Sequence, residues 1–260
     1  MNSLTRFSSA SVLAGLIASP AFAVSVDVPA NNVFGNETGH LRLGLAAMST
    51  NSVYDNYDEG ARPVPLVFYS GEKFYWMGPQ GGFNFISSEN HQLSAILEFA
   101  PDFWERSELQ NKHTSPIANR DDSDRSFNVG FQYLYKSDCG VLRLKAATDI
   151  SDSHEGGYYE LGYSYPFQLG EKLSIVPGVS VTQFDEDYTA YYFADNPDQG
   201  TGNEATRMSF KLGVTYELND NWQLLAGAAV SKLDDVDDGQ VILNDDKESN
   251  FYIGFTYKVF

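Results

Sequence analysis

The feature that most constrains this chain is a set of long segments in which apolar and polar residues alternate. One run has apolar side chains at every second position from Phe127 to Tyr135, and another does so from Phe251 to Val259. A period of two indicates β-strands with one apolar and one polar face. Each run has about ten residues, enough for a tilted strand to cross a membrane, whereas strands of soluble proteins usually have about five or six. The pattern therefore favours a transmembrane barrel over a soluble barrel or sandwich, which is the alternative.

The same pattern along the chain predicts an all-β fold, an antiparallel up-and-down transmembrane β-barrel of about twelve strands. The expected strands are 39–48, 64–70, 73–78, 82–87, 91–99, 125–136, 141–150, 157–167, 172–183, 205–217, 222–231 and 249–260. The three strands between 64 and 87 are short, so ten strands is the alternative count.

The connections between these segments give an independent indication of topology. In a bacterial barrel the periplasmic turns are tight and the extracellular loops are long. Tight connections rich in Gly, Asn, Asp and Ser do alternate with long ones at 49–63, 100–124, 184–204 and 232–248. Only Pro79-Gln80-Gly81 is too short for its class. We therefore expect both termini in the periplasm and the long loops outside the cell.

The first segment has the form of a secretory signal. Arg6 precedes a short apolar stretch from Val12 to Ile17, and Ala21 and Ala23 supply the small residues that a signal peptidase recognises. We expect cleavage after Ala23, a periplasmic lead over 24–38 and a barrel over 39–260. These features predict a protein of the outer membrane of a Gram-negative bacterium, in contact with its lipid and lipopolysaccharide.

Charge is unevenly distributed along the chain. The net charge of −18, from 17 basic and 35 acidic residues, argues against nucleic acid as a partner. Acidic residues gather in the expected outer loops, at 121–124, 185–187 and 234–246. Since a charge facing lipid costs about 2–4 kcal/mol near the midplane, basic residues in the polar phase of strands should face the lumen. These residues are Arg42, Arg143, Lys145, Arg207 and Lys211.

Few residues suggest catalysis or metal binding. Asp122 with Asp124, and Asp152 with His154, loosely resemble the acidic pair and the Asp–His pair of omptin proteases, but solvated loop residues explain them better. The acidic stretch 234–239 lacks the ligand spacing of a calcium loop. The lone Cys139 can form no intrachain disulfide. We therefore expect no catalytic, metal or cofactor site.

Several motifs resemble the MipA/OmpV family of outer-membrane proteins. They are Tyr54 to Gly60 followed by Pro63-Val64-Pro65-Leu66, then Gly81-Gly82-Phe83-Asn84, the tyrosine-rich element Tyr188, Tyr191, Tyr192 and Phe193, and the turn Asn219 to Trp222. In a barrel, the default interpretation of the tyrosine-rich element is part of the aromatic girdle at the membrane surface.

The resemblance implies a non-enzymatic scaffold that joins a murein-degrading lytic transglycosylase to a murein-synthesising penicillin-binding protein. One alternative is a small channel or porin, because the expected lumen carries basic side chains. A more remote alternative is an omptin-like hydrolase at the outer rim.

Overall fold

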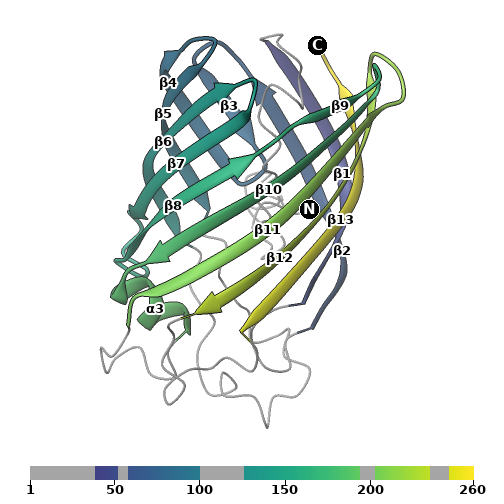
Figure 1. The fold of residues 1–260 in the computed structure, drawn as a ribbon. Coiled ribbons are helices and arrows are strands. Elements are labelled where there is room, and N and C mark those ends of the chain that lie inside the picture. The colour runs from purple at the N-terminus through teal and green to yellow at the C-terminus, as the bar shows by residue number, and fades with distance from the viewer. Residues whose placement is uncertain (1–38, 52–57, 100–125, 194–202, 235–245) are drawn as a thin grey trace, which may run out of the picture.

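The computed structural model describes residues 39–51, 58–99, 126–193, 203–234 and 246–260, which form a single antiparallel barrel (Figure 1). Its strands are β1 (His40–Asn51), β2 (Asp58–Ser70), β3 (Phe74–Met77), β4 (Gln80–Ser87), β5 (His91–Phe99), β6 (Phe127–Ser137), β7 (Gly140–Asp149), β8 (Gly157–Ser164), β9 (Phe167–Leu169), β10 (Leu173–Phe184), β11 (Ala205–Glu217), β12 (Trp222–Asp234) and β13 (Lys247–Lys258). One helix, α3 (Glu186–Phe193), follows β10.

Twelve strands close the barrel, which confirms the predicted fold class. Each strand pairs with the next along the chain, and β1 pairs with β13 to complete the ring. The short β9 is additional, because β8 and β9 both pair with β10. The expected strand 157–167 is therefore interrupted after Ser164, where Pro166 has no amide hydrogen to give to a ladder.

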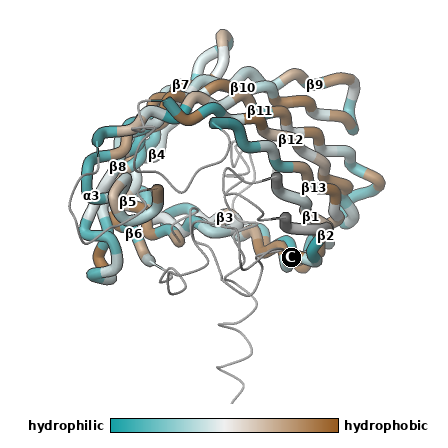
Figure 2. The backbone as a smooth tube through the Cα atoms, turned by 90° about the horizontal axis from the view of Figure 1, so that it is seen from below, coloured by the Kyte–Doolittle hydropathy of each residue, from teal (hydrophilic) through white to brown (hydrophobic). Residues whose placement is uncertain are grey.

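The alternation seen in the sequence sorts side chains between the two faces of the wall. Large apolar residues such as Phe131, Phe210 and Ile253 are exposed on the outer face, whereas Asn128 and Gln223 are fully buried inside. In the view along the barrel, apolar and polar positions alternate along β11, β12 and β13 (Figure 2). This arrangement is inverted relative to a soluble protein, as expected when lipid covers the outside. Among the described residues, no helix is long and apolar enough to cross a bilayer.

Most of the tight turns lie together at one end of the strands (Figure 1). The turn Asn219 to Trp222 is held by the side chain of Asn219, whose Oδ1 accepts the amide hydrogens of Asn221 and Trp222 at 3.0 Å. In the turn between β6 and β7, Gly140 has a φ of 120°, which residues with a Cβ rarely adopt. The C-terminal end of β13 and β9 lie at the end with the tight turns (Figure 1).

The wall is not equally tall around the ring. The strands β10 to β13 have 12 or 13 residues each, and we call them the tall wall. The hairpin of β3 and β4 has strands of only four and eight residues, and we call it the low wall. Next to it, β2 begins at Asp58 rather than near Val64 as expected, and so continues through Pro63.

Candidate functional site

The best-defined polar site is a cavity of about 160 Å³ in the barrel interior. Its lining includes residues from the low wall, from β5 to β8, and from β10 to β13. Four of the five basic residues expected in the lumen line it: Arg143, Lys145, Arg207 and Lys211. The fifth, Arg42, is buried inside β1 and lies 3.7 Å from Glu217.

Carboxylates accompany these cations. Nζ of Lys145 in β7 lies 3.1 Å from Glu98 in β5, two strands away, and Nε of Arg143 donates to Glu160 on the neighbouring strand β8 at 2.8 Å. The hydroxyl of Tyr158 also donates to Glu98. Because all these groups are largely buried, each charge depends on its partner to offset the loss of water.

Local sequence explains how the pairs form. Register places Lys145 opposite Glu160, and places Arg143 opposite Gly162. A Cβ on Gly162 would lie 3.0 Å from the Arg143 guanidinium, so the glycine gives that side chain room to lie along the wall. The alternation of the strands predicts that the cations face inward. Glu160 lies in the same inward phase, but the alternation does not show which acid accompanies which cation.

A second charged group lies near α3. A guanidinium nitrogen of Arg207 is 3.9 Å from Glu248, and its carbon lies 5.0 Å above the ring of Phe184. The ring thus covers one face of the guanidinium while the carboxylate approaches it. With Glu98 and Glu160, Glu248 gives the cavity three acidic residues beside its four basic ones.

Amides and a phenol line the cavity beside the low wall. Nε2 of Gln80 donates to the hydroxyl of Tyr75 at 3.0 Å, and Nε2 of Gln132 approaches the same oxygen at 3.5 Å. A Cβ on Gly82 would lie 2.2 Å from the Tyr75 ring, so this glycine lets the ring lie flat against β4. The cavity therefore offers neutral hydrogen-bonding groups on this side and paired charges on the other.

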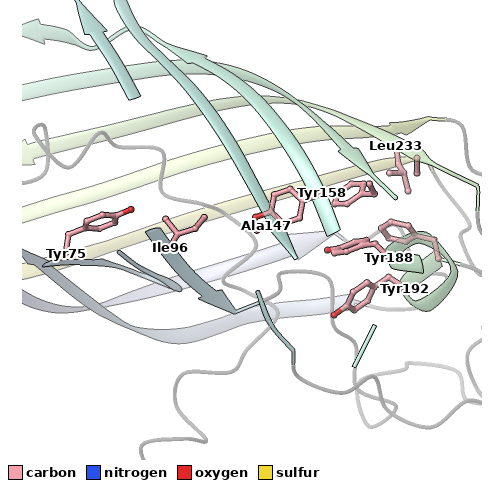
Figure 3. Close-up of a cluster of buried hydrophobic side chains, with 10 residues drawn as sticks. Tyr75, Ile96, Ala147, Tyr158, Tyr188, Tyr192 and Leu233 are labelled. Atoms are coloured by element: carbon pink, nitrogen blue, oxygen red, sulfur yellow. The ribbon is translucent and has the colours of Figure 1, made fainter. Parts of the chain in front are cut away.

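The helix α3 packs its aromatic rings against the inner side of the barrel, at the end where β10 stops. Asp185 caps its N-terminus, accepting the amide hydrogen of Tyr188 at 3.0 Å and that of Gly157 at 2.6 Å. Tyr188, Tyr192 and Phe193 are fully buried, and Tyr188 stacks on Phe184 at 4.5 Å. Tyr188 and Tyr192 lie beside the helix ribbon in Figure 3.

The assignment of this tyrosine-rich element to the aromatic girdle is therefore wrong for its buried members. The sequence predicts a loop for this segment rather than a helix. An eight-residue helix that is buried on several sides has no amphipathic pattern by which it could be identified. Tyr191 is partly buried and packs against the same cluster.

His154 is also buried, contrary to the expected solvated loop. Its Nε2 lies 3.1 Å from Oδ1 of Asn128, and its Nδ1 accepts the amide hydrogen of Gly156 at 3.1 Å. The ring packs edge-on against Tyr188 at 4.8 Å. Both ring nitrogens are thus engaged within the protein, an arrangement unlike that of a general base facing substrate.

The remaining histidines and the other polar candidates are not brought together in the part of the chain that the structure describes. His40 and His91 lie at the tight-turn end, bonded to the Phe260 carbonyl and the Tyr133 hydroxyl. Cys139 is exposed in a turn. Asp122, Asp124, His113 and most of 234–239 lie outside the described residues. Within the described ranges, no group of three or more His, Cys, Asp or Glu side chains could hold a metal ion.

Comparison with known proteins places this chain among relatives. YiaT of Escherichia coli O157:H7 is 23% identical over 226 residues, which cover 84% of this chain and 90% of that protein. The MltA-interacting protein of Escherichia coli K12 is 23% identical over 231 residues, which cover 85% and 90%. An outer membrane channel from Pseudomonas putida F1 superimposes with a TM-score of 0.45 at 9% identity, covering 85% of this chain and 96% of its own. Residues 43–259 match the family described as MltA-interacting protein MipA, and this chain is a member of that family.

Proposed function

We propose that this protein is a non-enzymatic scaffold of the outer membrane, which holds a murein hydrolase and a penicillin-binding protein at its periplasmic face. The observation that carries the proposal is the family match over residues 43–259, together with a relative named for its interaction with MltA. Lipid and lipopolysaccharide would surround the barrel.

The geometry is compatible with a rigid platform. Ion pairs link β7 to β8 and to β5 inside the barrel, and the rings of α3 pack against its inner side. At the tight-turn end, β9 extends beside β10 with Phe167, Gln168 and Leu169 all exposed. Exposed apolar side chains on a short protruding strand are suited to contact with another protein.

Affinity purification from detergent-solubilised envelopes tests this proposal. The wild-type protein should retain a lytic transglycosylase and a penicillin-binding protein, and the double variant Phe167→Ser, Leu169→Ser should retain less of both. Leu218→Ser, another exposed apolar residue in a tight turn, is the matched control. Recovery of neither enzyme with wild-type protein would refute the scaffold.

A small channel is the second candidate, because the interior holds a polar cavity of about 160 Å³. Planar-bilayer recordings distinguish it from a scaffold without conductance. Discrete conductance steps that change in Lys211→Gln would support a channel, and their absence at high protein concentration would exclude it.

We also propose that residues 1–23 are removed on export and that 24–38 remain in the periplasm. Mass spectrometry of protein purified from outer membranes should find an N-terminus at Val24. An N-terminus at Met1 would contradict this assignment.

A further inference from the structure

The barrel wall is lowest at the hairpin of β3 and β4. β3 has four residues and reaches Gly78 and Pro79, whereas a membrane-spanning strand needs about nine to eleven residues. The neighbouring strand β2 has 13 residues, but only Phe68, Tyr69 and Ser70 pair with β3. Among the described residues, the part of β2 from Pro63 to Leu66 therefore has a strand neighbour on the β1 side only.

Two prolines lie on this edge. The amide of Gly78 donates to the carbonyl of Val67 at 3.3 Å, so the backbone polar groups of Val67 point away from β1. Alternate residues of a strand point the same way, and this direction is therefore shared by Pro65 and Pro63. At both positions, the amide hydrogen that would point to the missing neighbour does not exist. Prolines at such positions are typical of strand edges that stay unpaired.

The edge lies beside the lipid-facing surface of the barrel. Val67 pairs with Leu43 and Pro65 with Leu45, and Leu43 and Leu45 are exposed on the apolar outer face. Backbone without a partner at this depth is tolerated where it borders protein or a water-filled space. The carbonyl oxygens of Pro63 and Pro65 therefore require protein or water beside this edge of β2.

The interior cavity reaches the low wall. Met77, Pro79, Gln80 and Phe99, at and beside the hairpin tip, all line it. Tyr75, Gln132, Glu98 and Lys145 line it further inside. Its volume is about 160 Å³, and an apolar cavity of about 150 Å³ can hold benzene. The cavity is therefore large enough for one aromatic ring.

We propose that the gap above Gly78 and Pro79 is a lateral opening, through which a single-ring amphipathic molecule passes from the outer leaflet into the cavity. The ring would pass Met77 and Phe99, and its polar group would bond to the Tyr75 hydroxyl and the amide of Gln80. Strand addition by a protein partner would need the donors that Pro63 and Pro65 lack, and so a small molecule is the better occupant. This site is independent of the scaffold proposed above.

Lipid-phase quenching tests the opening. In full-length Cys139→Ser protein, single cysteines at Met77 and at Ser231 are labelled with bimane, and the protein is placed in vesicles containing nitroxide-labelled acyl chains. Both residues line the same cavity, but Ser231 belongs to β12 of the tall wall, away from the proposed opening. We expect stronger quenching at position 77 than at 231. Heat-sensitive migration on gels shows that each labelled protein is folded. Equal quenching at positions 77 and 231 in folded protein would overturn the proposal.

Binding of p-nitrophenol to the full-length protein in nanodiscs tests the occupant. Saturable binding should weaken about three- to tenfold in Tyr75→Phe, because one hydrogen bond is lost. Tyr252→Phe changes a partly buried tyrosine that does not line the cavity, and should bind as wild type. Absence of saturable binding, or equal binding by both variants, would overturn the assignment of the ligand.

Discussion

The tall wall and the low wall differ in how their backbone polar groups are satisfied within the membrane. Each strand from β10 to β13 pairs on both sides over most of its length, so its backbone is satisfied inside the hydrocarbon layer. The low wall ends at Gly78 and Pro79, so the adjacent edge of β2 lacks a strand neighbour among the described residues. Pro63 and Pro65 lie on this edge. The difference teaches that a barrel can close as a ring without every strand reaching across the membrane.

Proline substitution gives the largest expected difference between the two walls. Val181 faces outward in β10 and pairs with both Met208 and Leu161. Val181→Pro should lower the free energy of unfolding by about 3 kcal/mol or more, because it removes a ladder hydrogen bond and distorts the strand. Guanidinium denaturation in lipid vesicles measures this loss.

The matched change in the low-wall edge is Pro65→Val, which should alter stability by less than about 0.5 kcal/mol. A loss as large as that of Val181→Pro would mean that this edge is not unpaired, and would remove the contrast between the walls.

Removal of a buried carboxylate should have the next largest effect. Glu160→Gln takes the acidic partner from the Arg143 guanidinium and should cost about 3 kcal/mol. The same denaturation experiment measures it. Asp234→Asn disrupts an ion pair with Lys232 that is open to water, and no loss should be detected. Equal losses would show that the interior pairs are as well solvated as those at the rim.

Closure of the tall wall on β1 depends on glycine. A Cβ on Gly44 would lie 1.9 Å from the carbonyl oxygen of Phe255 in β13, whereas one on Gly178 in β10 would meet nothing nearer than 3.4 Å. We expect Gly44→Val to cost about 2 kcal/mol through overpacking. Gly178→Ala should be tolerated. Closure of the barrel is measured as the fraction of protein whose migration on gels changes on heating. A wild-type fraction for Gly44→Val would show that closure does not depend on this glycine.

The helix α3, which lies between β10 and β11 in the chain, should show the smallest effect. The hydroxyls of Tyr192 and Ser126 lie 2.8 Å apart in a buried contact, so Tyr192→Phe should cost about 1 kcal/mol. Tyr159→Phe changes a tyrosine on the exposed outer face and serves as the control in the same unfolding experiment. An unchanged stability of Tyr192→Phe would show that α3 is not held by this bond.

Much of the barrel could be predicted from sequence because lipid outside and water inside impose an alternation of period two. The twelve wall strands and the tight turns follow from that pattern. β2 begins earlier than the sequence predicts, because a proline inside a strand ordinarily removes a ladder hydrogen bond. Pro63 is accommodated because, among the described residues, this part of β2 has no strand neighbour on the side away from β1. The helix α3 was not predicted because it is buried on several sides.

The candidate site divides in a similar way. The inward phase of Arg143, Lys145, Arg207 and Lys211 is a property of their own strands, and the sequence predicts it directly. Which acid accompanies each cation depends on register and on distance across the barrel. Lys145 meets Glu98, which lies two strands away and 47 residues earlier in the chain. No pattern along the chain shows that these two residues are in contact.

By itself, the sequence determined the class of fold, the approximate strands and the family, because each rests on short-range alternation or on motifs along the chain. Only the tertiary structure decided that the wall is low at β3 and β4, that its edge carries two prolines, and that a cavity reaches it. The reason is physical: strand pairing and cavity shape are set by contacts between residues far apart in sequence, and chain order does not encode those distances directly.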